Sequence, residues 1–354
     1  MWGRAGDHPA YRRAAALFNA SFCATIVVSK VSPVLELRAL TKHYPTHRAV
    51  NGVSLALERG EFFSLLGPSG CGKTTTLRLI AGFETPTEGE ILLNGQSVAA
   101  LKPYQRNVST VFQNYALFPH LPVSRNVAFG LERRGRQASS VIAEKVRKVL
   151  SLVRLEGKED RLPNQISGGE RQRAALARSL VLEPDVLLLD EPLSALDPKL
   201  RKQVRAELKD LQRSVGITFL FITHDQEEAL SLSDRMAVMT DGEIEQAGTP
   251  REIYQRPKSR FVAEFLGEVN WIGGAGVRPE SVRVSRDGPV DAARCFPAVV
   301  TGSTYLGNCV HVEMRLANGS CCVADVPQHE FHGEASGGVH IWWNAADELP
   351  PLDR

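Results

Sequence analysis

A chain of 354 residues is long enough for two domains, and its 43% hydrophobic and 23% charged residues are ordinary for a globular protein. This composition excludes collagen-like, disordered and membrane-embedded classes. The 42 Lys and Arg against 40 Asp and Glu leave a net charge of +2, which lacks the broad basic surface that nucleic-acid binding requires.

Residues 1–33 are predicted to form a disordered N-terminal extension. Its apolar part, AALFNASFCATIVV at 15–28, follows Arg12 and Arg13 but is shorter than the roughly 20 apolar residues of a membrane-spanning helix. We therefore expect neither export nor a membrane span, so a transport role requires a partner that supplies the pore. The six cysteines show no CxxC spacing, which indicates neither a zinc site nor a disulfide framework and fits a reducing cytosol.

The stretch FFSLLGPSGCGKTTTLRLIAGF, residues 62–83, predicts a phosphate-binding loop between a buried strand and a helix. Its glycines let the backbone turn with N–H groups inward, and the following helix directs its positive end at the same point. Lys73 would place its ammonium between the β- and γ-phosphates, and the Thr74 hydroxyl would bind Mg²⁺. The loop contributes further nucleotide-binding positions at Gly67, Ser69, Gly70, Cys71, Gly72 and Thr75.

Between residues 107 and 135, aromatic and apolar side chains crowd around a loop with the sequence VFQNYALFPHLPV. A solvent-exposed apolar patch is a candidate partner surface. An ordinary helical core is the alternative interpretation of the same side chains: Phe112, Tyr115, Leu117 and Phe118.

The stretch NQISGGERQRAAL, residues 164–176, predicts a second anion site at the start of a helix. Ser167, Gly168 and Gly169 would place a hydroxyl and backbone N–H groups at the positive end of the helix dipole. Because the first loop already holds a nucleotide, this second site can serve a polyanion presented from outside.

Two apolar strands predicted downstream each end in ionisable residues. The run at 186–189 ends in Asp190 and Glu191, beside the place where an open α/β sheet binds phosphates. Asp190 can hold Mg²⁺ through water, and Glu191 can orient or deprotonate an attacking water. The run at 218–223 is expected beside the loop strand, so we place His224 at the γ-phosphate; a structural histidine is the alternative.

After residue 246 the pattern changes to a short helix and then to β-type runs. Thr249, Pro250 and Glu252 form a capping box with proline at the first helical position. The β-type runs that follow are divided by turns such as Asn318-Gly319, and they predict a small β-barrel.

In this order, the motifs resemble those of the ATP-binding subunits of ABC transporters. The family signature is a Ser-Gly-Gly before a Gln/Arg-rich helix start, and here it reads ISGGERQR, with Ile166 for the usual leucine and Glu170 for the common glutamine. The resemblance implies three more site residues: Tyr44 stacking on adenine, Gln113 in catalysis and Mg²⁺ binding, and Asp197 in the SALD loop.

The resemblance implies an α/β P-loop ATPase domain at 34–268, with a helical subdomain at about 115–180, and a small all-β, OB-like TOBE domain at 269–354. It implies ATP and Mg²⁺ as ligands, and a homodimer in which each Ser-Gly-Gly closes over the other copy's γ-phosphate. Two transmembrane permease subunits and a periplasmic binding protein would complete the complex, with this chain at the cytoplasmic face of the inner membrane. Only a short segment that begins IGGAG separates FLGEVNW from the RPE triplet, which indicates a shortened TOBE barrel.

Within the family, LDPKLRKQVRAELKDLQRSVGITFLFITHDQEEALSLSDR and IEQAGTPREIYQRP are most similar to polyamine (spermidine and putrescine) importer ATPases. Ferric iron, sulfate, phosphonate and sugar importers are alternatives, because the ATPase does not touch the cargo. A non-transport ABC ATPase would carry a long coiled coil or two cassettes, which this sequence lacks. A P-loop kinase or GTPase would leave the Ser-Gly-Gly without a task.

Overall fold

The computed structural model describes residues 32–135, 137–194, 196–286, 288, 294–330 and 338–352. The predicted N-terminal extension lies outside these residues, except for its last two positions. The chain divides into two compact units that meet at Pro250 and Arg251, and each unit is described by itself.

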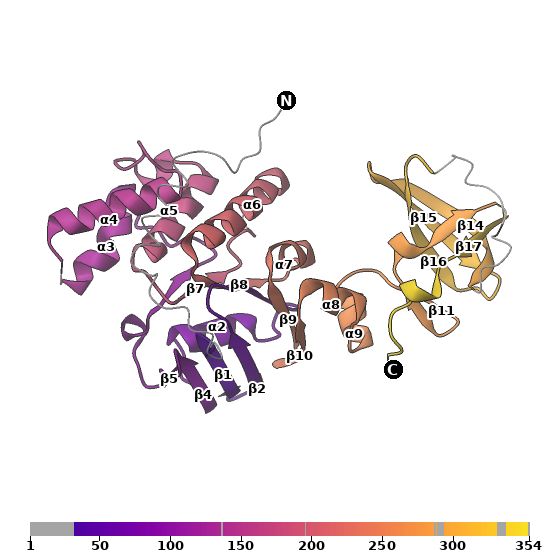
Figure 1. Cartoon of the computed structure of the whole chain (residues 1–354), viewed down its shortest axis with the longest axis horizontal. Coiled ribbons are helices and arrows are strands. Elements are labelled where there is room, and N and C mark those ends of the chain that lie inside the picture. The colour runs from indigo at the N-terminus through magenta and orange to yellow at the C-terminus, as the bar shows by residue number, and fades with distance from the viewer. Residues whose placement is uncertain are drawn as a thin grey trace. The chain divides into compact units, whose positions relative to one another are not determined.

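A six-stranded sheet of order β10-β9-β3-β8-β7-β6 lies at the centre of the described part of the first unit. Figure 1 labels its strands β7, β8, β9 and β10. Its strands are parallel except for β10, which pairs antiparallel with β9. The buried strands predicted at 62–66, 186–189 and 218–223 are confirmed. The strand bounds are β3 Phe62–Leu66, β6 Val108–Val111, β7 Val186–Asp190, β8 Thr218–Thr223, β9 Arg235–Thr240 and β10 Glu243–Gly248.

Alternate residues of the central strands enter two different hydrophobic cores. Phe62 of β3 and Phe221 of β8 belong to one core, with ring centroids 5.8 Å apart. Their neighbours Phe63 and Ile222 belong to the other core. The sheet is therefore covered on both faces, which explains why these strands are continuous apolar runs rather than alternating ones.

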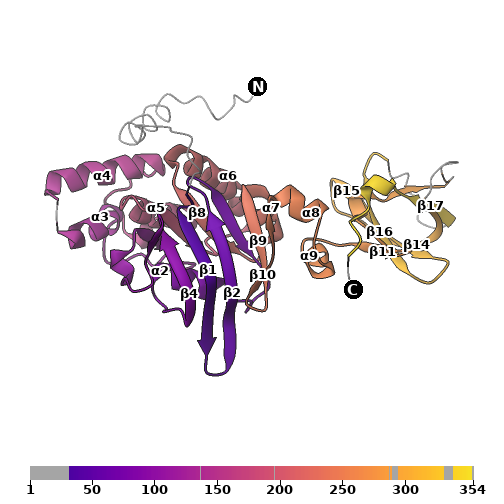
Figure 2. The same cartoon turned by 60° about the horizontal axis from the view of Figure 1, so that its bottom comes forward.

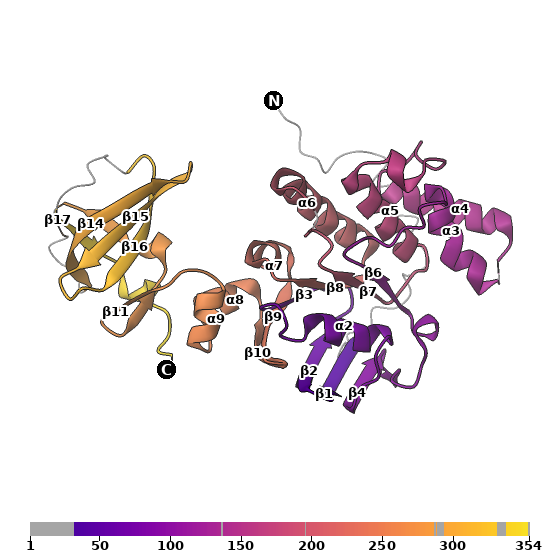
Figure 3. The same cartoon turned by 180° about the vertical axis from the view of Figure 1, so that it is seen from behind.

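The second core lies between this sheet and an antiparallel sheet of order β2-β1-β4-β5, with helix α2 between the two sheets (Figure 3). The helix buries Leu77, Leu79 and Ile80 in this core. Figure 2 shows β1, β2 and β4 from their outer side. The bounds are α2 Lys73–Ala81, β1 Leu35–Tyr44, β2 His47–Leu57, β4 Glu88–Leu93 and β5 Gln96–Ser97.

Helices cover the other face of the central sheet. The longest, α6, buries Val204, Leu208, Leu211 and Val215 at spacings of three and four, so that one face of the helix meets the core. No helix in the described ranges combines the length and hydropathy of a bilayer-crossing segment. The bounds are η1 Pro103–Gln105, α3 Val123–Arg134, α4 Ser139–Leu152, η2 Pro163–Gln165, α5 Gly168–Leu180, α6 Pro198–Val215 and α7 Gln226–Leu232.

The second unit is built on a five-stranded antiparallel sheet of order β13-β17-β14-β15-β16, and β11 and β12 form a separate hairpin. The predicted turn at Asn318-Gly319 is confirmed between β15 and β16, where Gly319 has a φ of +84°. The helix predicted after Thr249 begins at Pro250. The bounds are α8 Pro250–Gln255, α9 Arg260–Phe265, β11 Asn270–Ile272, β12 Ala275–Val277, η3 Pro279–Ser281, β13 Arg283–Ser285, β14 Cys295–Tyr305, β15 Cys309–Leu316, β16 Cys321–Pro327, β17 Gly338–Trp342 and η4 Ala345–Asp347.

Arg278, the first residue of the RPE triplet, joins the helices of this unit to its strands. It is 4% exposed, and its Nη1 donates to the carbonyl oxygens of Ala263 and Gly267, both at 2.9 Å. Its guanidinium lies 4.2 Å from the ring centroid of Tyr254, whose hydroxyl donates to Glu280 at 2.7 Å. The triplet therefore has a structural role within the unit.

Candidate nucleotide-binding site

The loop between β3 and α2 packs so closely against its neighbours that two of its glycines admit no side chain. A Cβ on Gly67 would collide with the carbonyl oxygen of Met239. Gly72 caps α2 with a φ of +104°, and a Cβ there would collide with the carbonyl oxygen of Ala49 on β2. Gly70 lies at the open side of the loop, where nothing approaches within 4 Å of a Cβ.

Lys73, the first residue of α2, is held inside the loop. Its ammonium donates to the carbonyl oxygens of Gly67 at 2.7 Å and Pro68 at 2.9 Å, and the residue is 5% exposed. Cys71 Sγ lies 3.7 Å from the same ammonium. Burial raises the pKa of the Cys71 thiol, so this side chain stays neutral and packs as a small filler. Of the other loop positions, Ser69 is exposed and Thr75 is half-buried.

Thr74 and Asp190 meet across the base of the loop. The Thr74 hydroxyl lies 3.4 Å from Asp190 Oδ1, within hydrogen-bond range. Burial raises the pKa of the Asp190 carboxyl, and the negative charge of Glu191 raises it further, against the opposing hydrogen bond from Thr74. The Thr74 hydroxyl and the Asp190 carboxylate, oxygen ligands of the kind that Mg²⁺ prefers, thus converge, and a cation would stabilise this half-buried carboxylate, so the two residues fit a magnesium ion.

Glu191 and His224 are brought together by the pairing of β7 with β8. Asp190 is in register with Ile222, and Glu191 donates its backbone N–H to the Ile222 carbonyl at 3.1 Å. Glu191 has a φ of +44°, a left-handed conformation that costs of order 1–3 kcal/mol in a non-glycine residue. His224 Nδ1 lies 3.1 Å from Glu191 Oε2. The predicted position of β8 beside β3 is confirmed, because the two strands pair in parallel up to Leu66 and Thr223.

Gln113 connects to this pair through a serine. Its Nε2 donates to Ser194 Oγ at 3.0 Å, and that hydroxyl donates to the Glu191 carbonyl oxygen at 2.9 Å. Gln113 itself is exposed. The sequence motifs alone did not indicate Ser194 as the intermediate.

The Ser-Gly-Gly stretch lies at the start of α5, as predicted. Ser167 is the N-cap residue, and its Oγ accepts from the Glu170 backbone N–H at 3.3 Å while Glu170 Oε2 accepts from the Ser167 N–H at 2.8 Å. Within the described ranges, the Ser167 side chain bonds only to Glu170. Hydrogen bonds from Ser167 lower the pKa of the Glu170 carboxyl, so this residue is a carboxylate at neutral pH.

The predicted Asp197 loop adjoins this helix start. Asp197 is the N-cap of α6, and its Oδ1 accepts from the Leu200 backbone N–H at 3.0 Å. Leu200 lies over Gly169, where a Cβ would be 3.5 Å from its Cδ1, and Leu196 lies 3.9 Å from the Cβ position of Gly168. The signature and the Asp197 loop therefore form one surface.

Tyr44 ends β1, and its ring stacks on His47 with centroids 5.3 Å apart. Lys42 Nζ lies 5.2 Å from the Tyr44 ring centroid. The following strand, β2, carries Ala49 to the loop at Gly72, so the hairpin that holds Tyr44 borders the loop.

The apolar patch predicted around Phe112 is only partly a surface. Tyr115 is 9% exposed and belongs to the hydrophobic core, and the Phe118 ring packs at a tilt against Phe129 of α3 with ring centroids 4.5 Å apart. Tyr115 is buried and Phe118 is half-buried, with Phe129 of α3 and Arg178 of α5 in contact with this loop. The exposed aromatic side chain in this region is instead Phe83, which is 53% exposed and has its ring centroid 6.0 Å from that of Phe112. Tyr104, in η1, is 75% exposed.

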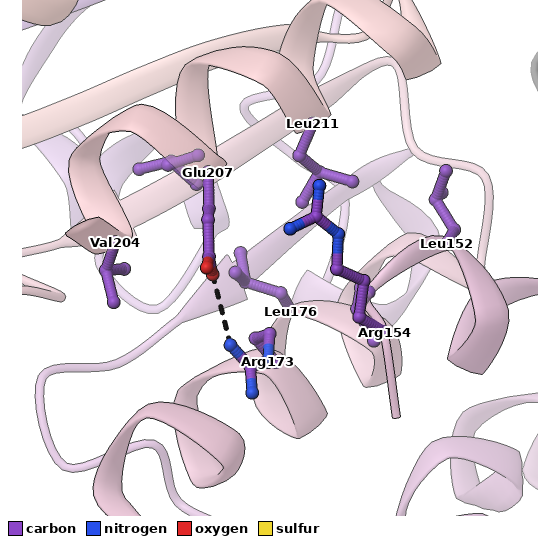
Figure 4. A pocket seen from close by; sticks show the side chains of 9 residues that line it. Leu152, Arg154, Arg173, Leu176, Val204, Glu207 and Leu211 are labelled. Atoms are coloured by element: carbon purple, nitrogen blue, oxygen red, sulfur yellow. Dashed lines mark hydrogen bonds and ion pairs between the residues drawn. The ribbon is translucent and has the colours of Figure 1, made fainter. Parts of the chain in front are cut away.

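A hollow that is partly open to solvent lies between the end of α4 and helices α5 and α6 (Figure 4). Leucine and valine side chains form most of its lining, and Arg173 Nη1 pairs with Glu207 Oε2 across it at 3.1 Å. Its lining includes no residue of the loop at 67–75, so it is separate from the nucleotide-binding residues.

The sequence matches two known families, ABC transporter over residues 50–194 and TOBE domain over residues 275–349. It is 46% identical to the spermidine/putrescine import ATP-binding protein PotA of Trichodesmium erythraeum, over 86% of this chain and 90% of that protein. It is 47% identical to the spermidine/putrescine import ATP-binding protein PotA 1 of Pseudomonas aeruginosa, over 86% and 92%.

Two solved structures share the fold of the first unit. A dimeric post-hydrolysis state of the ATP-binding cassette MJ0796 bound to ADP and Pi has a TM-score of 0.54 at 33% identity, over 61% of this chain and 99% of that one. For cbiO1 of Clostridium perfringens, part of the ABC transporter complex cbiONQ, the TM-score is 0.59 at 29% identity, over 63% and 90%. The predicted fold class is confirmed, and the chain belongs to the family of ABC transporter ATP-binding proteins with a C-terminal TOBE domain.

Proposed function

We propose that the chain is the ATP-hydrolysing subunit of an ABC importer for polyamines, spermidine or putrescine. The assignment of the substrate rests on the 46% identity, over 86% of this chain, to a protein named for spermidine/putrescine import. The chain would act at the cytoplasmic face of the inner membrane with two permease subunits and a periplasmic binding protein.

The loop residues bind the phosphates of ATP in this proposal. The backbone between Gly67 and Gly72 and the N-terminus of α2 offer N–H groups to the phosphate oxygens. The Lys73 ammonium donates to two carbonyl oxygens of the loop in the structure, and it would donate to the β- and γ-phosphates once ATP is bound. Tyr44 stacks on the adenine.

Glu191 and His224 perform the hydrolytic step. Glu191 orients the attacking water and accepts its proton, and His224, 3.1 Å from the carboxylate, fixes Glu191 and contacts the γ-phosphate. Thr74, Asp190 and Gln113 would hold Mg²⁺, which when bound neutralises phosphate charge.

A second copy of the chain completes each site. Ser167 and the N–H groups of Gly168 and Gly169 lie at a helix start apart from the chain's own loop contacts, and they would bind the γ-phosphate held by the partner's loop. Asp197 adjoins this surface and enters the same interface. ATP thereby holds the dimer closed, and its cleavage lets the dimer open.

Exposed aromatic side chains, one of which contacts Phe112 beside Gln113, are the surface that receives the permease. Phe83 and Tyr104 offer apolar area to a helix of the membrane subunit. Gln113 links this surface to Glu191 through Ser194, so that docking and hydrolysis influence each other.

The catalytic part is tested with Glu191→Gln. This variant should bind ATP, form a dimer by light scattering in Mg-ATP, and hydrolyse ATP at least about 100-fold more slowly, because the general base is lost. The double variant Glu191→Gln/Ser167→Arg is the matched control, and it should stay monomeric because arginine blocks the signature surface. A monomeric Glu191→Gln variant in Mg-ATP would contradict the shared site.

The substrate is tested in proteoliposomes that contain the chain, its permease subunits and the binding protein. Spermidine or putrescine should stimulate ATP hydrolysis and accumulate as radiolabelled solute. Stimulation by ferric iron, sulfate, phosphonate or a sugar, with none by either polyamine, would assign the chain to another importer.

A further inference from the structure

One face of α6 carries basic side chains at every fourth position, and each pairs with an acidic residue in or next to α7. Such ladders are usually structural supports between packed helices. The pairs are Arg201 Nη1 to Asp225 Oδ2 at 3.4 Å, Arg205 Nη2 to Glu227 Oε1 at 2.7 Å, and Lys209 Nζ to Asp234 Oδ1 at 2.7 Å.

Arg201 makes one contact that the other two residues of this ladder do not share. Its Nη2 donates to the carbonyl oxygen of Leu196 at 3.1 Å, in the loop that leads into Asp197. Its Nη1 meets Asp225, the residue after His224, and Asp225 uses its other oxygen, Oδ1, to cap α7 at the Glu228 N–H. One planar guanidinium thus bonds to two separate loops.

Those two loops carry residues with different tasks in the nucleotide site. His224 acts beside Glu191 in the chain's own site, whereas Asp197 lies on the surface that meets the partner copy. Side chains placed about 1 Å from their productive position can lose about 100-fold in rate. A rigid, two-pronged donor is therefore suited to fixing both loops, and lysine, with a single ammonium, is not an equivalent replacement.

We propose that Arg201 is a positioning residue for ATP hydrolysis, which fixes the His224 segment relative to the Asp197 loop through Asp225 and the Leu196 carbonyl. This inference rests on the function proposed above. The contacts of Arg201 with Asp225 and the Leu196 carbonyl lie outside the phosphate-binding loop, so we expect its loss to affect the hydrolytic step rather than ATP binding.

The test compares Arg201→Gln with Arg205→Gln in the full-length chain. Arg205 is on the same helix face one turn later, is 9% exposed and also pairs with a carboxylate, so it controls for loss of a structural ion pair. Arg201→Gln should lower kcat about tenfold at an unchanged half-saturating ATP concentration. Arg205→Gln should lower Tm by at least as much but leave kcat within about twofold. Arg201→Lys should not restore kcat.

A double-mutant cycle with Asp225→Asn locates the effect, because asparagine still caps α7 but no longer pairs with the guanidinium charge. The double variant Arg201→Gln/Asp225→Asn should be no slower than Arg201→Gln alone. Equal kcat losses in Arg201→Gln and Arg205→Gln, full rescue by Arg201→Lys, or additive losses in the cycle would each overturn the inference. His224→Ala and Glu191→Gln separate the two proposals: if both variants keep full ATPase activity, the proposed hydrolytic site fails, whereas if both are inactive and Arg201→Gln is normal, only the role of Arg201 fails.

Discussion

Close packing of the phosphate loop against β2 accounts for the glycine at position 72. Its φ of +104° is a conformation that side-chain-bearing residues rarely adopt, and the Ala49 carbonyl oxygen occupies the place of a Cβ. Gly70 in the same loop also has a positive φ, +82°, but its Cβ position is open. An alanine at position 72 would therefore meet both backbone strain and a steric clash, whereas an alanine at position 70 would meet strain alone.

We expect Gly72→Ala to destabilise the chain by about 3 kcal/mol or more and to abolish ATP binding, because both strain and collision act. Gly70→Ala carries strain alone, so its cost in stability should be about 1–2 kcal/mol. Thermal unfolding of both variants and a nucleotide-binding titration make the comparison. Equal Tm losses in the two variants would show that the contact with Ala49 does not restrict the loop.

At the residue scale, the sequence predicted the chemical groups of the site better than the residues that hold them. Lys73, Asp190, Glu191 and His224 follow from motif and strand position, because each stands at a strand end or helix start that the apolar pattern marks. The arginines that hold loops in place could not be recognised in the same way, because arginine is usually exposed and the sequence does not show which carbonyl oxygens it will bond. Three arginines, two of them buried and Arg178 half-buried, tie loops or helix ends together through backbone carbonyls: Arg106 to Leu79 and Ile80, Arg178 to Tyr115 and Ala116, and Arg278 to Ala263 and Gly267.

At the scale of elements, the order of strands was the least accessible part of the fold. The apolar runs predict buried strands, and the phosphate rule places their carboxyl ends at one edge. The antiparallel sheet of β1, β2, β4 and β5 lies outside that argument, because its pairing depends on contacts between residues far apart in sequence. The role of Asp225 was accessible, since an Asp followed three residues later by Glu228 is an N-cap pattern.

Helix α7 contains a carboxyl that makes stability depend on pH. Glu228 is 2% exposed, and burial raises its pKa above the ordinary value, opposed by the 2.6 Å hydrogen bond from the Thr223 hydroxyl. The folded state therefore favours the protonated form. The stability that this preference contributes is full below the pKa of the unfolded chain and is lost as pH rises through the raised folded pKa.

Glu228→Gln should remove this loss, since glutamine is neutral and still accepts from Thr223. We expect the variant to match the parent Tm at about pH 5 or below and to exceed it at about pH 8. Glu227→Gln, one residue earlier and exposed, is the control and should show no gain at the higher pH. A Tm difference that is constant across this range would argue that Glu228 is ionised throughout.

At the scale of the whole molecule, the contacts divide the chain at Pro250 and Arg251. The domain limits drawn from the sequence, 34–268 and 269–354, stay a prediction. The hydrogen bonds of Arg278 to Ala263 and Gly267 lie wholly within the second unit, which includes α9. A change at Arg278 should therefore affect that unit first.

We expect Arg278→Met to destabilise the second unit by about 3 kcal/mol, because it leaves buried carbonyl oxygens without their donor. Calorimetry of the full chain should show a lowered transition for this unit, while ATP hydrolysis in the same preparation stays within about twofold. Arg283→Met is the control, since Arg283 is exposed and its guanidinium lies 4.9 Å from the Trp342 ring centroid. A parallel loss of ATPase activity in Arg278→Met would place this arginine in the hydrolytic function.

Strand β8 pairs in parallel with β3 on one side and with β7 on the other. The loop lysine follows β3 and the acidic pair ends β7, so within the described sheet β8 joins the two strands that carry the phosphate chemistry. Local unfolding of β8 would therefore disturb the loop after β3 and the acidic pair after β7 together. Amide protons of β8 should accordingly exchange with deuterium at the slow rate of global unfolding. The nucleotide-binding site should unfold in a single cooperative step with the sheet.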